Sequence, residues 1–212
     1  MKTAVVWGAD GGIGQALVNN LNAAGWTVFA IGRHLDRLPS AAAQRLEADV
    51  NSEFAVQNAA LAVGQEATAV DLWVYAVGDI TAVPVRDMGY GTWQRIMQAN
   101  LGGAYLAAHH SLPLLAPDAH LFFLGAASER LRLPGLSAYA AAKAGLEAFA
   151  EALRKEERRR KVTVVRPGAV VTPLWEKVAL KMPKDATTPE KVAGRILQAY
   201  HEGHTGHLDL VH

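Results

Sequence analysis

Cysteine is absent from this chain of 212 residues, and its absence excludes several kinds of site. Without thiols there is no disulfide framework, no cysteine nucleophile and no thiolate metal site. The absence fits a reducing compartment, so we expect the protein in the cytoplasm. The chain also lacks any apolar run of about 18 residues, the length that a membrane span requires. We therefore expect no membrane partner.

An excess of charge of either sign is also lacking. The chain has 21 lysines and arginines against 20 aspartates and glutamates, for a net charge of +1. This balance argues against a general polyanion binder, so nucleic acid is not an expected partner. Histidines near the C-terminus have no acidic cluster beside them, and we predict no metal site. A chain of this length ordinarily forms one α/β domain, and we assign residues 1–212 to a single domain.

Strand-like segments alternate with helix-forming segments along the chain. The strand-like segments are Ala4–Trp7, Thr27–Ile31, Arg45–Asp49, Asp71–Tyr75, His120–Leu124, Val162–Arg166 and Gly206–Val211. The helix-forming segments are about Gln15–Ala24, Glu53–Val63, Thr92–Leu115, Ala138–Arg158 and Pro189–His201. Alternation of this kind predicts an α/β fold: a Rossmann-like, doubly wound parallel sheet of about seven strands with helices on both faces.

A glycine-rich turn lies between the first expected strand and the first expected helix. Gly8, Gly12 and Gly14 give it the spacing G-x-x-x-G-x-G. Such glycines permit tight turning and close backbone approach, and the N-terminus of the next helix favours a pyrophosphate. A glycine turn of no function is the alternative, and the strand before it and the helix after it argue against that alternative.

Tyr139 and Lys143 are four residues apart in an expected helix, so their side chains project from one face. A neighbouring positive charge favours the phenolate, and we therefore expect the pKa of Tyr139 to be lowered. A phenol tuned in this way can exchange a proton with a substrate oxygen near neutral pH. Alone the pair is weak evidence, because tyrosine and lysine often share a helix face by chance.

Asn100 falls in the middle of another expected helix, where asparagine is a poor helix former. A surface asparagine is one interpretation. The following Leu101-Gly102-Gly103 is also unfavourable in an exposed helix, which favours close packing or a functional role.

Together these motifs resemble the short-chain dehydrogenase/reductase family over nearly the whole chain. Asp49-Val50 matches its adenine-contacting position, and Pro167-Gly168 followed by Thr172 matches an element that seats the nicotinamide. The resemblance implies Tyr139, Lys143 and Asn100 as catalytic residues. The expected cofactor-binding residues are Gly8, Asp10, Gly11, Gly12, Ile13, Gly14, Arg33, Asp49, Val50, Ala76, Gly78, Asn100, Tyr139, Lys143, Pro167, Gly168, Val170 and Thr172.

The sequence departs from the family pattern where the family has a catalytic serine, because that position is Ala126. The nearest hydroxyl is Ser128, which we include among the candidate catalytic residues, although serine in a loop is more often a turn or cap residue. Loss of one such hydrogen-bond donor can lower a rate by about 10²–10³. Trp7 replaces the threonine that usually opens the glycine motif, and Tyr75-Ala76-Val77-Gly78 replaces the family's N-N-A-G.

The end of the second expected strand indicates the cofactor. An acidic residue there would bind the ribose 2′-hydroxyl, but this chain has Gly32 followed by Arg33. A guanidinium suits a 2′-phosphate, and Arg37 could share that role. We therefore predict NADP(H) in preference to NAD(H). Asp10, inside the glycine turn, is a counter-signal, and Arg33 could instead merely end the strand.

The predicted function is NADPH-dependent reduction of an aldehyde or ketone, or the reverse reaction, with Tyr139 as general acid and base. The alternative is an NADP(H)-binding protein with little catalysis, a redox sensor or scaffold, which Ala126 favours. The short segment from Pro173 to Pro183 predicts an open pocket. Its apolar walls, which favour a small or hydrophobic substrate, would come from Leu131, Leu133, Pro134, Trp175 and Leu180. The resemblance also implies a homodimer or homotetramer.

Overall fold

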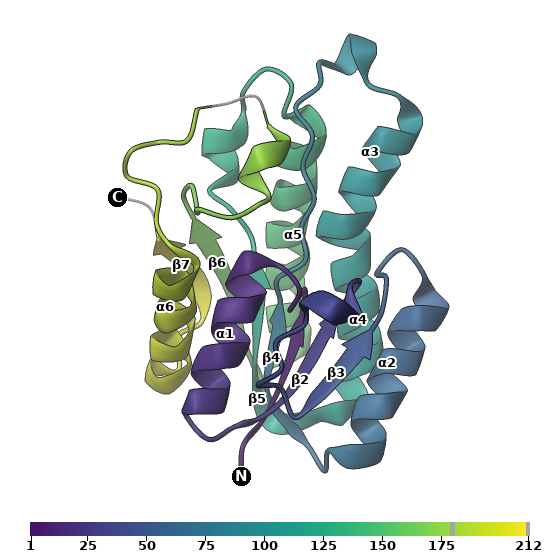
Figure 1. Ribbon diagram of the computed structural model, residues 1–212, viewed down its shortest axis with the longest axis vertical. Helices are drawn as coiled ribbons and strands as arrows, with labels where there is room; N and C mark the ends of the chain where they lie inside the picture. Colours follow the sequence, from purple (N-terminus) through teal and green to yellow (C-terminus); the bar gives the residue numbers. More distant parts are fainter. Residues whose placement is uncertain (179–180, 211–212) are drawn as a thin grey trace.

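The computed structural model describes residues 1–178 and 181–210, without the side chains of Ser128 and Arg130. Its strands form one sheet in the order β3-β2-β1-β4-β5-β6-β7, in which each neighbouring pair is parallel (Figure 1). The strands are β1 (Thr3–Trp7), β2 (Thr27–Gly32), β3 (Gln44–Glu47), β4 (Val70–Tyr75), β5 (Leu115–Leu124), β6 (Lys161–Pro167) and β7 (Gly206–Leu210). The predicted Rossmann-like parallel sheet is confirmed.

Helices cover both faces of the sheet, as predicted. On one face lie α1 (Gly12–Ala23) and α6 (Pro189–Glu202), and on the other lie α2 (Glu53–Glu66), α4 (Gly103–Ser111) and α5 (Ser137–Glu156). In β1, Val5 and Trp7 belong to one buried core, and Ala4 and Val6 belong to the other. Two buried faces explain why this strand is apolar throughout rather than alternating. Among the described residues, no helix is long and apolar enough to cross a membrane.

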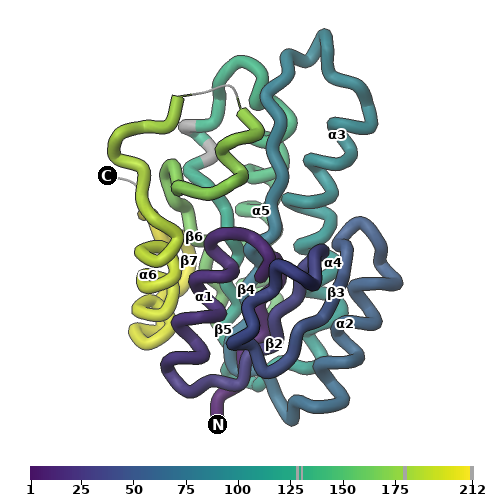
Figure 2. The backbone as a smooth tube through the Cα atoms, in the orientation of Figure 1, coloured from purple at the N-terminus to yellow at the C-terminus, as the bar shows by residue number. Residues whose placement is uncertain are grey.

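The direction of winding changes between β1 and β4. From β1 the chain proceeds outwards through β2 to β3, and then returns to β4 and proceeds the other way to β7. A crevice forms at the carboxyl ends of the strands at such a switch point, and ligands of open α/β sheets bind there. Figure 2 follows the segment between β6 and α6, in light green, across this end of the molecule.

The expectation of one continuous helix over Thr92–Leu115 is wrong. The segment contains α3 (Tyr90–Met97), a π-helical stretch η3 (Gln98–Gly102), α4 and a final 3₁₀ turn, and Leu115 already belongs to β5. The hydroxyl of Tyr75 donates a hydrogen bond of 2.8 Å to the carbonyl of Ala99, an acceptor that a regular helix would use internally. Pro113, which has no N–H to donate, lies in the 3₁₀ turn. A contact from β4 therefore accompanies the π-helical stretch, and a proline marks the end of the helix.

Other bounds differ by a few residues. β5 begins five residues before the expected His120, and β3 ends at Glu47 rather than at Asp49. Val211, the expected last residue of the final strand, lies outside the described residues.

Candidate active site

A cleft of about 630 Å³ lies at the carboxyl ends of the strands. Most of the predicted cofactor residues line it, namely Gly8, Asp10, Gly11, Gly12, Ile13, Arg33, Asp49, Val50, Ala76, Gly78, Tyr139, Lys143, Pro167, Gly168, Val170 and Thr172. Gly14 and Asn100 do not line the cleft but lie buried next to residues that do. The side chain of Ser128 lies outside the described part of the chain.

The glycines of the first turn allow backbone segments to approach closely. Gly8 has a φ of 80°, and a Cβ atom there would lie 2.7 Å from backbone atoms of Ala76 and Val77. A Cβ atom at Gly14 would overlap the carbonyl oxygen of Gly8, and one at Gly12 would lie 2.9 Å from Cγ2 of Thr172. The turn therefore excludes side chains for reasons of packing as well as of ligand approach.

Helix α1 begins at the floor of this cleft with no side-chain cap. Its N-cap residue is Gly11, and its first turn contains no acidic residue. The first N–H groups of a helix have no intrahelical partners, and they carry the positive end of the helix dipole. This end of α1 suits a pyrophosphate. The residues present thus fit the dinucleotide that the sequence predicts.

Asp10 contacts the end of β2, where a ribose is expected. Its Oδ2 accepts a hydrogen bond of 3.2 Å from the backbone N–H of Arg33. A Cβ atom at Gly32 would lie only 2.6 Å from Oδ1 of Asp10, so this carboxylate lies where a side chain of residue 32 would begin. Arg33 and Arg37 are exposed and also line the cleft. The end of β2 therefore has one carboxylate, that of Asp10, and two guanidinium groups, those of Arg33 and Arg37, beside the cleft.

Tyr139 and Lys143 both lie on the face of α5 that lines the cleft, as their spacing predicts. The expectation of a lowered pKa for Tyr139 is wrong, because burial raises it to about 12. The Nζ atom of Lys143 lies 5.6 Å from the centre of the Tyr139 ring and donates a hydrogen bond of 2.7 Å to the carbonyl of Leu124. Desolvation of the phenolate therefore outweighs any attraction from the ammonium.

Burial also changes the ammonium of Lys143, of which 3% is exposed. Desolvation lowers its pKa to about 8, and the carboxylate of Glu147, one helical turn further along, opposes this shift. The lysine thus titrates close to neutral pH.

Asn100 lies in the π-helical stretch with its side chain fully buried. Its Nδ2 donates to the carbonyls of Asp79, at 2.6 Å, and Ile96, at 2.8 Å. Its Oδ1 has no hydrogen-bond partner within the described part of the chain. A Cβ atom at Gly78 would lie 3.3 Å from this Oδ1 and 3.9 Å from Nζ of Lys143, so both polar atoms lie close to Gly78, which lines the cleft. π-Helical stretches of this kind are frequent at functional sites.

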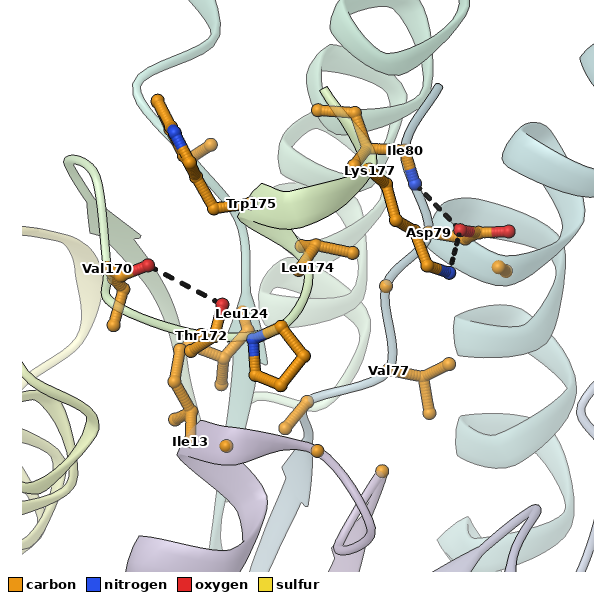
Figure 3. Close-up of a pocket in the computed structure, with 18 of the residues that line it drawn as sticks. Ile13, Val77, Asp79, Ile80, Leu124, Val170, Thr172, Leu174, Trp175 and Lys177 are labelled. Atoms are coloured by element: carbon orange, nitrogen blue, oxygen red, sulfur yellow. Dashed lines mark hydrogen bonds and ion pairs between the residues drawn. The ribbon is translucent and has the colours of Figure 1, made fainter. Parts of the chain in front are cut away.

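The position of the missing serine belongs to the cleft, because Ala126 lines it and is 7% exposed. After the end of β6, Thr172 lies beside the start of α1, where Ile13 is located, and Leu174 lies further along the same segment (Figure 3). Leu131, Leu133 and Trp175 contribute to the lining as predicted. Pro134 is not among the lining residues, and Leu180 lies outside the described chain.

Asp79, Arg95 and Lys177 line the cleft as one charged cluster that the sequence motifs do not indicate. Asp79 forms ion pairs with the other two. The sequence offered one signal, an aspartate directly after Gly78 at the end of a strand motif. No motif marks Arg95, in α3, or Lys177, which lies 98 residues after Asp79.

A sequence profile of the short chain dehydrogenase family matches residues 2–183. The chain therefore belongs to the short-chain dehydrogenase/reductase family, and it is an oxidoreductase of a family that uses NAD(P)(H).

Among its relatives is an uncharacterized oxidoreductase of Staphylococcus epidermidis, 29% identical over 185 residues, which are 82% of this chain and 80% of that protein. Two solved structures share the fold with a TM-score of 0.88. One is a 3-ketoacyl-(acyl-carrier-protein) reductase from Brucella melitensis complexed with NADH, at 20% identity, with 99% of this chain and 96% of that chain covered. The other is a short chain dehydrogenase from Shigella flexneri complexed with NADP, at 22% identity, with 98% and 95% covered.

Proposed function

We propose that this protein is an NADP(H)-dependent reductase or dehydrogenase that interconverts a small carbonyl compound and its alcohol, with Tyr139 as general acid and base. The observation that carries the proposal is the convergence of Tyr139, Lys143 and the glycine turn on one cleft, with Asn100 directly behind it. These residues come from three separate segments of the chain. Chance placement of a tyrosine and a lysine on one helix face does not explain that convergence.

In the proposed mechanism, bound NADPH supplies the hydride for the carbonyl carbon. Tyr139 donates its phenolic proton to the carbonyl oxygen, and it removes that proton in the reverse direction. The phenol is protonated at neutral pH, as the proton donor in reduction must be, although burial raises its pKa to about 12. The ammonium of Lys143 holds the ribose and supplies the positive charge next to the phenol. Asn100 and Lys143 both have a polar atom close to Gly78, and in the proposed mechanism they hold a water there through which the proton is replaced.

The preference for NADP(H) is part of the proposal. Arg33 and Arg37 line the cleft at the end of β2, and guanidinium groups bind phosphates through paired hydrogen bonds. The carboxylate of Asp10 at the same position opposes a 2′-phosphate, so we expect a preference rather than exclusive use. The complexes of the two structural relatives, one with NADH and one with NADP, show that this fold accommodates either dinucleotide.

The proposed substrate is a small or hydrophobic aldehyde or ketone. The part of the cleft near Tyr139 is bordered by an apolar cluster that contains Ile80, Leu136 and Val178 and against which Leu174 and Trp175 pack. We also propose a homodimer or homotetramer, formed through α4 and α5 as the family resemblance implies. Tyr105 of α4, which is 50% exposed, is available for such a contact. A cytoplasmic location stays a prediction.

The alternative, a cofactor-binding protein with little catalysis, rests on Ala126. We predict that Ala126→Ser raises kcat by about tenfold or more, because a new hydroxyl would stabilise the substrate oxygen. Ser128→Ala provides the comparison, since an unchanged rate in that variant removes Ser128 from the site. An Ala126→Ser variant that turns over no faster than the parent would contradict a rate limited by the missing serine.

The test of the function combines two measurements on the purified protein. Fluorescence titration with NADPH and NADH gives the affinity for each dinucleotide. Absorbance of the reduced nicotinamide then follows turnover with a panel of aldehydes, ketones and quinones. Tighter binding of NADPH and its oxidation by at least one carbonyl would support the proposal. Tight binding without turnover across the panel would favour the sensor or scaffold.

A further inference from the structure

A buried carboxylate lies at the inner end of the cleft, next to Gly78. Asp79 is 8% exposed, and its Oδ1 accepts a hydrogen bond of 2.9 Å from the backbone N–H of Ile80. The same oxygen lies 2.8 Å from Nζ of Lys177, as Figure 3 shows. The other oxygen, Oδ2, forms an ion pair with the guanidinium of Arg95 on α3. One carboxylate thus joins two cations that come from different parts of the chain.

The backbone of the same residue holds Asn100. The carbonyl oxygen of Asp79 accepts a hydrogen bond of 2.6 Å from Nδ2 of Asn100, and the carbonyl of Ile96 accepts a second from the same atom. The amide of Asn100 is therefore oriented in part by the loop that contains Asp79. Arg95 supports this loop as well, because its Nη2 donates a hydrogen bond of 2.7 Å to Oγ1 of Thr81.

Lys177 belongs to a segment that lines the cleft, residues 172–178, which we call the lid. Its base is closed by backbone hydrogen bonds of 2.9 Å from Val171 to Thr187 and from Thr187 to Ala169. At the far end, Lys177 reaches across the cleft to Asp79 (Figure 3). The following residue, Val178, belongs to the same apolar cluster as Ile80 and Tyr139. The ion pair of Lys177 and the apolar contacts of Val178 therefore hold the lid to the same part of the cleft.

We propose that Asp79 is a positioning residue, whose carboxylate fastens the lid through Lys177 while the backbone of its loop orients Asn100. The inference rests on the proposed function, since it assigns Asp79 a task in that reaction. It predicts that the carboxylate fastens the lid directly and, through its ion pairs, steadies the loop whose backbone orients Asn100. An apolar residue at this position would lose the connection to the lid and would leave that loop without its two ion pairs.

The surrounding charges explain why a carboxylate is needed. Burial lowers the pKa of Lys177, and the positive charges of Arg33 and Arg95 lower it further. In Asp79→Asn, Lys177 and Arg95 would face each other as two cations beside a neutral amide. A hydrogen bond to a charged group contributes enough free energy to change an opening equilibrium by about tenfold or more. The lid of that variant is therefore expected to open.

The first test measures amide hydrogen exchange of the lid in the full-length protein, without substrate. We expect exchange in peptides covering residues 172–178 to quicken by about tenfold in Asp79→Asn and in Lys177→Met. Lys177→Arg retains the cation and should keep exchange slow. Lys184→Met is the matched control, because Lys184 is an exposed lysine between the lid and α6 and does not line the cleft. That variant should exchange as the parent does.

The second test separates positioning from a merely structural role. With a carbonyl that the parent reduces, Lys177→Met should raise KM and leave kcat within about threefold, whereas Asp79→Asn should raise KM and also lower kcat about tenfold. The double variant should be no worse than Asp79→Asn alone, because the two residues act as a pair. Melting curves of each variant show whether it folds.

The outcomes are distinct. Unchanged lid exchange in both Asp79→Asn and Lys177→Met would overturn the proposal, even if the parent reduces carbonyls. A uniform fall in kcat with unchanged KM would assign Asp79 to fold stability and overturn it too. If the parent reduces no carbonyl, the proposed function fails, and the exchange experiment still decides whether Asp79 fastens the lid.

Discussion

At the scale of single residues, burial determines the protonation states of the two side chains proposed for the chemistry. Tyr139 has its pKa raised to about 12 and Lys143 has its pKa lowered to about 8, so each is shifted away from its charged form. A charged lysine at this position therefore costs stability at neutral pH. We expect this loss of stability to be tolerated because the proposed reaction uses the positive charge of Lys143.

We predict that Lys143→Met is more stable than the parent by about 1 kcal/mol at pH 7, although it loses turnover. The unfolded chain binds a proton at this lysine up to its ordinary pKa of 10.5, whereas the folded protein releases it above about 8. The stability of the parent should therefore rise between these two values, and the advantage of the variant should shrink. Urea denaturation at pH 7 and pH 10 tests this. A variant that is less stable than the parent at pH 7 would show that the hydrogen bond to Leu124 outweighs desolvation.

Residue spacing could indicate Tyr139, Lys143, Asn100 and the glycines, because helix geometry and turn geometry are local. It could not indicate the direction of the pKa shift of Tyr139, which depends on burial rather than on the neighbouring lysine. Asp79 was missed for a related reason, since Lys177 lies 98 residues further along the chain. A contact between such distant residues has no local signature.

At the scale of elements, the glycine turn between β1 and α1 is tightly constrained by its backbone conformation and packing. Gly8 and Gly25 both have positive φ, at 80° and 78°, but only Gly8 has backbone atoms where a Cβ would lie.

We predict that Gly8→Ala costs about 3 kcal/mol or more, because backbone strain and overlap add. Gly25→Ala, which has nothing within 4 Å of the added atom, should cost about 1 kcal/mol. Urea denaturation of the two variants gives the comparison. Equal losses in both would mean that the packing of the turn against Ala76 and Val77 is not what constrains Gly8.

Strands were easier to predict than the long helix before β5. Seven strand-like segments indicated the seven strands, and the central ones are largely apolar because a parallel sheet buries both faces of them. The edge strand β3 instead alternates between partly buried and exposed residues. The break at Gln98–Gly102 depends instead on a hydroxyl from β4 that reaches the carbonyl of Ala99. Local propensity marked Asn100 and its glycines as unusual in a helix, but it could not specify a π-helical stretch.

At the scale of the whole molecule, a buried histidine links β5, β6 and the loop before β7. His120 is 1% exposed, and its Nε2 lies 2.9 Å from Oγ1 of Thr163, whose hydroxyl donates to the carbonyl of His204. Because that hydroxyl is used as a donor, Nε2 of His120 must donate to it, which leaves Nδ1 unprotonated. Nδ1 is buried and has no partner among the described residues.

We predict that stability falls as the pH falls from about 6.5 to about 3, in part because of His120. Burial, followed by the charge of Lys161, lowers the pKa of His120 from 6.5 to about 3. Between these values the unfolded chain takes up a proton that the folded protein does not, at up to about 1.4 kcal/mol per pH unit. His120→Gln should flatten this decline, and the exposed His201→Gln should leave it as it is. Equal slopes for the parent and His120→Gln, measured by urea denaturation, would contradict this assignment.

The measurement that tests the central claim most directly compares Tyr139→Phe with the parent protein. The variant lacks only the phenolic hydroxyl, so it should bind NADPH with the affinity of the parent in a fluorescence titration. Its turnover of any carbonyl that the parent reduces should fall by about 10²–10⁴. We predict retained binding with lost turnover. Full turnover in Tyr139→Phe would contradict it, because the proton would then have to come from another group.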